Sequence, residues 1–138
     1  VLSRWPVEHS ASLTAAQSFE LYPPGWPRLR WYNLHLRSYP FAPYALHGFA
    51  GNPSPFDDPF DALLGFKEAC LAEREEIAVA LERSAQLPDL RDVLEDIHQT
   101  MGVSVIITGD FNAASHLDDA EGPLWPCSVE CAAYGLVD

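Results

Sequence analysis

Residues 105–119 read VIITGDFNAASHLDD, and this stretch decides the fold class. Its first four residues are apolar or β-branched, which is typical of a buried β-strand. An acid, an amide, a hydroxyl and an imidazole follow directly, at Asp110, Asn112, Ser115 and His116. Ligands often bind beyond the carboxyl ends of strands in α/β sheets. The stretch is therefore either an ordinary polar turn or the edge of an active site.

The segments around this strand predict a mixed α/β domain over residues 1–138. Pro6 stops the first strand, and the stretch that follows is rich in proline and reads as irregular until residue 28. Apolar residues at helical spacing predict two helices, with Asp61 as the cap of the first and the acids of both on solvated faces, Glu82 among them. The predicted strands cover residues 1–7, 29–36 and 103–108, and the predicted helices cover about 61–84 and 88–102.

Composition limits the function. Eight basic and twenty acidic residues give the 138-residue chain a net charge of −12, which should repel polyanions unless metal ions supply positive charge. No apolar run approaches the roughly 20 residues that cross a bilayer, and the chain shows no signal peptide. We expect a soluble protein with no protein partner, and both a cytoplasmic and a secreted location stay open. The odd count of three cysteines gives no disulfide framework, so small buried hydrophobes are favoured over zinc ligands.

Polar side chains cluster at the carboxyl ends of two predicted strands. Successive residues of a strand point to opposite faces, so Asn33 and His35 share one face. Asp110 and Asn112 share one too if the extended conformation continues past the strand. An acid and an amide can orient a water or hold a metal ion, and an imidazole can donate to a phosphoryl oxygen. The alternative is that these are ordinary hydrogen-bonded residues, with Asp110 capping a turn.

Four motifs, taken together, make the chain resemble the endonuclease/exonuclease/phosphatase superfamily of metal-dependent phosphoesterases. They are TGDFN (108–112), NLHL (33–36), SRWP (3–6) and the closing WPCSVECAAYGLVD (125–138), and they occur in the order that the family has. The aromatic loop in NLHLRSYPFAPYALHG (33–48) and the SHLD that follows GDFN also look like a bacterial-type branch of these hydrolases. The resemblance covers nearly the whole chain. It implies a two-sheet α/β sandwich of the DNase I-like type.

The resemblance also implies roles for individual residues. Asp110 would activate the attacking water or help to hold Mg²⁺ or Mn²⁺, and Asn112 would orient that group and the phosphate. His35 would stabilise charge on a phosphoryl oxygen. Asn33, Ser115 and His116 are expected to be supporting or substrate-side residues, although Ser115 and His116 equally suit a local turn. The implied reaction is in-line attack of water on a phosphomonoester or phosphodiester, with small or lipid-linked substrates mildly favoured over nucleic acid.

Several groups that the family needs cannot be assigned. These are an upstream metal-binding Glu, an early Asn, a later Asp and a downstream Asp-His pair; Glu8 and Glu20 come too late to supply the Glu. We therefore expect an internal fragment of a longer open reading frame that truncates the domain at both ends. The isolated chain should then be weakly active or inactive. The alternative function is a binding or scaffold role in a catalytically inactive member of the same fold.

Overall fold

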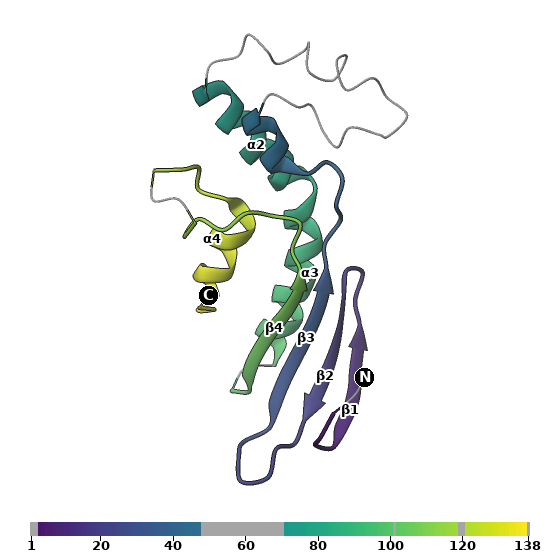
Figure 1. Cartoon of the computed structure of the whole chain (residues 1–138). Coiled ribbons are helices and arrows are strands. Elements are labelled where there is room, and N and C mark those ends of the chain that lie inside the picture. The colour runs from purple at the N-terminus through teal and green to yellow at the C-terminus, as the bar shows by residue number, and fades with distance from the viewer. Residues whose placement is uncertain (1–2, 48–70, 101, 119–120, 138) are drawn as a thin grey trace. The chain divides into compact units, whose positions relative to one another are not determined.

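A computed structural model describes residues 3–47, 71–100, 102–118 and 121–137 of the chain, which is mixed α/β (Figure 1). The chain forms two compact units, one of residues 1–36 with 89–111 and the other of residues 37–88 with 112–138. The elements are β1 (Val7–Ser12), β2 (Ala16–Leu21), β3 (Leu29–His35), η1 (Ala42–His47), α2 (Leu71–Ser84), α3 (Gln86–Gln99), β4 (Ser104–Asp110) and α4 (Pro126–Ala133). No helix among the described residues has both the length and the apolar character needed to cross a membrane.

The first unit contains a four-stranded sheet in the order β1-β2-β3-β4. β1, β2 and β3 pair antiparallel in succession, and β3 pairs parallel with β4 (Figure 1). The register of the parallel pair aligns Leu29 with Ser104 at one end and His35 with Asp110 at the other. The predicted α/β class is therefore confirmed. The polar carboxyl ends of β3 and β4 lie at the same end of the sheet.

The prediction for the first 21 residues is wrong, while residues 22–28 are irregular as predicted. Residues 3–6 belong to no strand, and the SRWP motif precedes β1 instead of forming it. The stretch predicted as irregular holds the hairpin of β1 and β2, whose turn is closed by a 2.8 Å hydrogen bond from the N–H of Leu13 to the carbonyl of Ala16. Because VEHSAS and AQSFEL contain few apolar residues, their periodicity does not reveal a strand. Pairing with β3 supplies the backbone partners instead.

The remaining elements agree with the predictions where the structure describes them. β3 and β4 occupy the predicted strand segments, and α3 begins two residues before Pro88. α2 confirms the second half of the predicted helix at residues 61–84, while its cap at Asp61 lies outside the described residues. α4 ends in a Schellman turn, in which Gly135 has a φ of +79° and the N–H of Leu136 bonds to the carbonyl of Cys131 at 3.1 Å.

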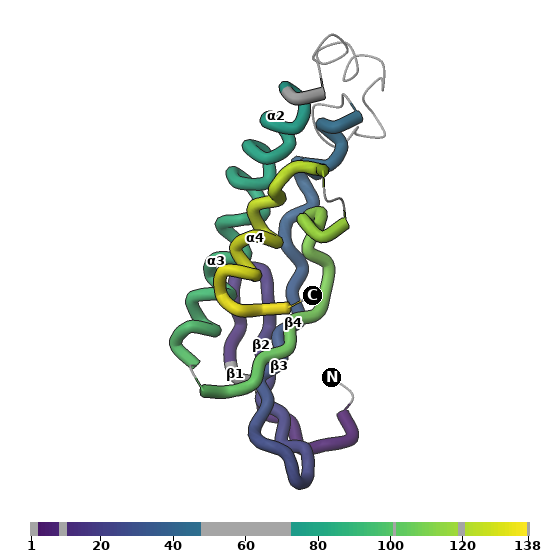
Figure 2. The backbone as a smooth tube through the Cα atoms, turned by 90° about the vertical axis from the view of Figure 1, so that its left-hand side faces the viewer, coloured from purple at the N-terminus to yellow at the C-terminus, as the bar shows by residue number. Residues whose placement is uncertain are grey.

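One face of the sheet is covered by α3. Tyr32 and Leu34 alternate with exposed residues along β3 and are buried on this face. Leu90 and Leu94 of the predicted apolar stripe of α3 are fully buried, as is Val93, which was not predicted, whereas Ile97 is half-buried. Figures 1 and 2 show this helix running along the sheet. Burial of these side chains between helix and sheet supplies the core of the first unit.

The prediction that the acids of α3 all lie on a solvated face is wrong. Asp96 accepts a 2.6 Å hydrogen bond from the phenol of Tyr32, and one of its oxygens lies 3.2 Å from a guanidinium nitrogen of Arg30. Arg30 is 8% exposed and also contacts Ser18 at 3.3 Å. Burial and the bond to Asp96 raise the pKa of Tyr32 well above its usual range. The periodicity of the α3 sequence reveals the apolar stripe. It does not reveal that Asp96 forms an ion pair with the buried Arg30.

The opposite face of the sheet is partly apolar. Phe19 and Trp31 are paired across β2 and β3, with ring centroids 5.5 Å apart, and Ile106 is the next residue in the same row. Ile106 is 46% exposed although its sequence neighbours predict a buried strand. The indole N–H of Trp31 donates to the hydroxyl of Thr108 at 2.6 Å. Toward the carboxyl ends of β3 and β4, this face therefore changes from apolar to polar.

The second unit packs η1 and α4 against α2. Its core contains Ala42, Ala45, Ala78 and Trp125, which are all buried. Gln86, fully buried, donates from its amide to two backbone carbonyls of the segment that precedes η1, at 2.9 and 2.8 Å. These bonds tie the loop before η1 to the start of α3.

Glu82 contradicts its predicted place on the solvated face of α2. It is fully buried, and its Oε1 accepts a 2.7 Å hydrogen bond from the backbone N–H of Cys127 in the first turn of α4. Trp125 is the N-cap of α4 and provides no side-chain cap, so a residue from another helix satisfies this donor. Cys127 is buried, in agreement with its prediction as a small hydrophobe.

Replacing Glu82 with glutamine should change how stability depends on pH. Burial raises the pKa of Glu82 above the value of 4.5 in an unfolded chain. Ionisation of Glu82 therefore lowers the free energy of unfolding. This free energy is greatest below pH 4.5 and falls as the pH rises through the raised pKa of Glu82. Glu82→Gln keeps an acceptor for Cys127 and has no charge to bury. Urea unfolding should show the variant to be the more stable at pH 7, with a difference that vanishes toward pH 4.

The matched control is Glu76→Gln, which removes an exposed carboxylate from the same helix. Its unfolding free energy should follow the wild type at every pH. Equal pH dependence of the wild type and Glu82→Gln would contradict the cost assigned to the Glu82 charge.

Candidate functional site

The parallel pairing of β3 and β4 brings His35 and Asp110 together. They are register partners, and the Nε2 of His35 lies 3.9 Å from a carboxylate oxygen of Asp110. The N–H of Leu36 bonds to the carbonyl of Asp110 at 2.9 Å, which continues the pairing to the end of the strand. Both side chains are open to solvent, at 75% and 64% exposed. Exposed ion pairs of this kind contribute little to stability.

Gly109 makes this approach possible. Its φ is +131°, and a Cβ at this position would lie 1.9 Å from the carbonyl oxygen of Leu34. Any side chain would therefore overlap the backbone of β3, next to the residue that pairs with His35. The glycine of the GDFN motif thus has a steric role: it lets β4 approach β3 closely just before Asp110.

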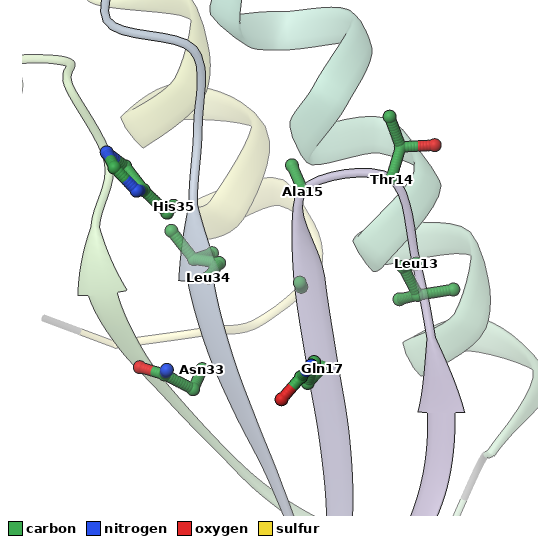
Figure 3. Close-up of a pocket in the computed structure, with 8 residues that line it drawn as sticks. Leu13, Thr14, Ala15, Gln17, Asn33, Leu34 and His35 are labelled. Carbon is green, nitrogen blue, oxygen red and sulfur yellow. The ribbon is translucent and has the colours of Figure 1, made fainter.

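A shallow hollow of about 310 Å³ in the same unit includes His35, but not Asp110, in its lining (Figure 3). It is lined by Asn33 and His35 from β3, by Gln17 from β2, and by residues of the turn between β1 and β2. Gln17 was not predicted as a site residue. Its register opposite Asn33 could not be found from the sequence, because β2 itself was missed. The structure thus adds a second amide to the polar face that carries Asn33 and His35.

Asn112 does not share a strand face with Asp110, as it would have if the extended conformation continued. β4 ends at Asp110, and Asn112 has a φ of +45° in the left-handed region. Asparagine tolerates this conformation better than most residues, so the sequence suits the turn. Asn112 belongs to the second unit. Covalent geometry alone keeps its Cα within about 7 Å of that of Asp110.

Ser115 and His116 lie in an ordered turn of the second unit. The N–H of Ser115 donates to the carboxylate of Asp118 at 3.3 Å, and the N–H of Leu117 donates to the hydroxyl of Ser115 at 3.2 Å. The local-turn interpretation of these residues is therefore correct as a description of the backbone. The imidazole of His116 also contacts Ser128 in α4, a residue that the sequence did not single out.

The carboxyl end of β4 suits a hydrated magnesium ion. No group of three or more His, Cys, Asp or Glu that could hold a metal ion occurs among the described residues. Mg²⁺ needs fewer protein ligands, because it keeps several waters and commonly takes one or two carboxylates together with substrate phosphate. Asp110 supplies an exposed carboxylate, and Asn112 an amide two residues later. This donor set fits Mg²⁺ or Mn²⁺.

Comparison with known proteins assigns no family to this chain. No protein-family model, curated protein or solved structure matches the chain. Its chemistry is therefore inferred from its own residues. The described residues place an exposed imidazole and carboxylate side by side at the ends of two parallel strands, and the imidazole also lines a hollow with Asn33 and Gln17.

Proposed function

We propose that this chain carries part of the active site of a Mg²⁺- or Mn²⁺-dependent phosphoesterase. The observation that carries the proposal is the register of β3 and β4, which sets His35 beside Asp110. Both side chains are exposed to solvent, at 75% and 64%. An acid and an imidazole at one sheet edge can act on two sides of the same phosphoryl group.

Each residue has a distinct task in the proposed reaction. Asp110 polarises or deprotonates the attacking water and, together with Asn112, holds the metal ion. Bound Mg²⁺ or Mn²⁺ would neutralise the phosphate and stabilise the leaving oxygen. His35 donates from Nε2 to a non-bridging phosphoryl oxygen. Asn33 lies two residues before it on the same face and orients the bound group by hydrogen bonding.

We further propose that the fold is part of a DNase I-like two-sheet sandwich. Two features support this. The mixed sheet has a helix on one face and a partly apolar opposite face around Trp31 and Ile106. The GDFN motif begins in the last two residues of the parallel strand β4. The SRWP segment departs from the family pattern, because residues 3–6 precede β1. The supporting features therefore come from the β3 and β4 end of the sheet.

The substrate class follows from charge. With a net charge of −12, the chain attracts a polyanion poorly unless the metal ion offsets the local field. A small or lipid-linked phosphoester brings only one or two negative charges to the site. We therefore propose phosphoesters of this kind ahead of nucleic acid.

Asp110→Asn tests the proposed function. The substitution keeps the size of the side chain and removes its charge, so Mn²⁺ affinity of this chain should fall at least about 10-fold. Turnover should fall at least about 100-fold, because a general base contributes that much or more. Affinity is measured from Mn²⁺-induced broadening of amide resonances. Turnover of bis(4-nitrophenyl) phosphate by the same chain is measured in the presence of Mn²⁺.

Asp92→Asn is the control, because it removes an exposed carboxylate from α3 in the same unit. It should leave both quantities unchanged. Equal Mn²⁺ affinity and turnover in wild type and Asp110→Asn would exclude Asp110 from the site. Mn²⁺ and phosphate binding without any turnover would instead favour the inactive binding or scaffold role.

Asn112→Gly tests the role of the Asn112 side-chain amide separately from the left-handed backbone conformation at this position. Glycine accepts the φ of +45° without a side chain, so the backbone conformation is kept while Mn²⁺ affinity should fall about 10-fold. Asn112→Ala should lose affinity similarly and, in addition, about 1 kcal/mol of stability, because alanine disfavours left-handed backbone. Titration calorimetry and urea unfolding measure the two effects. Undiminished Mn²⁺ affinity in Asn112→Gly would show that the amide does not contact the metal ion.

A further inference from the structure

The hollow of the first unit and the carboxylate of Asp110 lie on opposite sides of His35. β3 pairs with β2 along one side and with β4 along the other. The N–H of His35 bonds to the carbonyl of Ala15, in the turn before β2, at 2.8 Å, whereas the N–H of Leu36 bonds to the carbonyl of Asp110 in β4 at 2.9 Å. The hollow is lined by residues of β2, β3 and this turn. A group bound at His35 therefore has the carboxylate on its β4 side and the hollow on its β2 side.

Two side-chain amides form the polar part of the hollow. Gln17 and Asn33 are register partners, and Figure 3 shows them side by side on adjacent strands. The Cβ atoms of such partners lie about 5 Å apart, so both amides can contact the same small group. Both side chains are exposed, and in the part of the chain that the structure describes neither makes a hydrogen bond. Because an amide both donates and accepts, a hydroxyl group is a suitable ligand for each of them.

The lining of the hollow favours a neutral, polar group over an ionic or an apolar one. Apart from the imidazole of His35, no ionisable side chain occurs among the described residues that line it, so an ammonium group or a second phosphate would find no opposite charge. Leu34 in the lining is buried and offers little apolar surface. A long acyl chain could reach the apolar row around Trp31 only by crossing the amides, which would lose their contact with water.

The proposed reaction places the leaving group on the side of the hollow. In-line displacement sets the attacking water and the leaving oxygen on opposite sides of the phosphorus. When Asp110 activates the water from the β4 side and His35 contacts a phosphoryl oxygen, the ester oxygen points toward β2. The hollow thus lies where the alcohol part of the phosphoester would be bound.

We propose that Gln17 and Asn33 bind the leaving alcohol of the substrate, and that this alcohol carries further hydroxyl groups, as glycerol does. This assignment rests on the proposed phosphoesterase function and names its leaving group. The water oxygen forms the new bond to phosphorus and gives a proton to Asp110. The bond between phosphorus and the ester oxygen breaks, and the alkoxide takes a proton from solvent in the shallow hollow. Asn33 lies two residues, or about 7 Å, from His35 along β3, a spacing that hydroxyl groups a few bonds from the ester oxygen can span.

The test compares glycerol 1-phosphate with propyl phosphate, which has the same carbon chain without the two extra hydroxyls. Affinities of this chain are measured from shifts of its amide resonances in the presence of Mg²⁺. The wild type should bind glycerol 1-phosphate about 5- to 10-fold more tightly, the effect of about one additional hydrogen bond. Gln17→Met keeps the length of the side chain and removes the amide. It should reduce this preference to within about 2-fold and leave the affinity for propyl phosphate within about 2-fold of the wild type.

Gln99→Met is the matched control, because it removes an exposed amide from the end of α3 in the same unit. This variant should keep the preference of the wild type. Asp110→Asn should weaken the binding of both phosphates to the same extent, because it acts on the metal ion and not on the alcohol.

The outcomes separate this inference from the proposed function. Equal affinity of the wild type for the two phosphates, or an undiminished preference in Gln17→Met, would overturn the inference, while Mn²⁺ binding that depends on Asp110 would still support the proposed metal site. A preference that is lost in Gln17→Met, combined with binding that responds neither to Mg²⁺ nor to Asp110→Asn, would retain the alcohol site and reject the proposed role of Asp110.

Discussion

Gly109→Ala is expected to lower the free energy of unfolding by at least about 3 kcal/mol, and it is the largest single effect that we predict. The added Cβ would meet the carbonyl oxygen of Leu34 at 1.9 Å, and the φ of +131° disfavours any side chain. Relief requires β4 to separate from β3, which breaks their pairing next to Asp110. Urea unfolding followed by tryptophan fluorescence measures the loss, since Trp31 lies on β3.

Gly102→Ala is the matched control. Gly102 also has positive φ, at +88°, but nothing lies within 4 Å of the Cβ that it would gain. This variant should therefore lose only the conformational cost of about 1 kcal/mol. Equal losses at the two glycines would mean that backbone conformation, not the contact with Leu34, accounts for the effect. If Gly109→Ala folds, its Mn²⁺ affinity should also fall, because the backbone that carries Asp110 must shift.

Asp96→Ala should destabilise the first unit by about 3 kcal/mol, the cost of leaving a buried charge without its partner. It removes the carboxylate nearest the guanidinium of Arg30 and the acceptor of the Tyr32 phenol. Glu20, 3.8 Å from Arg30, compensates only in part. Urea unfolding of the wild type and the variant at pH 7 measures the difference.

Asp92→Ala, on the exposed side of α3, is the control and should stay within about 0.5 kcal/mol of the wild type. A double variant, Arg30→Met with Asp96→Leu, should recover most of the loss, because apolar residues can replace a buried ion pair at little cost. A loss below about 1 kcal/mol in Asp96→Ala would show that water or Glu20 satisfies Arg30 instead.

The parts of the fold that sequence could predict are those with strong apolar patterns. β3, β4 and α3 have runs or stripes of large apolar residues, and each was found close to its actual bounds. The hairpin of β1 and β2 was missed, since its strands are formed by backbone pairing with β3 and carry few apolar side chains. Gln17 was missed as a site residue for the same reason. Propensity and periodicity do not show a pairing between segments distant along the chain.

The contacts of acids with buried groups were the second feature that the sequence did not predict. An acid that periodicity places on the solvated face of a helix can still be buried or half-buried when another element packs against it. Glu82 meets the first turn of α4, and Asp96 meets Arg30 of β3. The partners are 45 and 66 residues away in the chain, so no local pattern contains them.

By itself, the sequence determined the α/β class, the residue types at the ends of two strands and the glycine that the close approach of those strands requires. These features depend on local composition, which a chain carries whatever its partners are. Only the tertiary structure decided that β3 and β4 pair in the register that sets His35 beside Asp110, and that Ser128 contacts His116. Register and side-chain contact depend on packing between distant segments, and packing is a property of the whole fold.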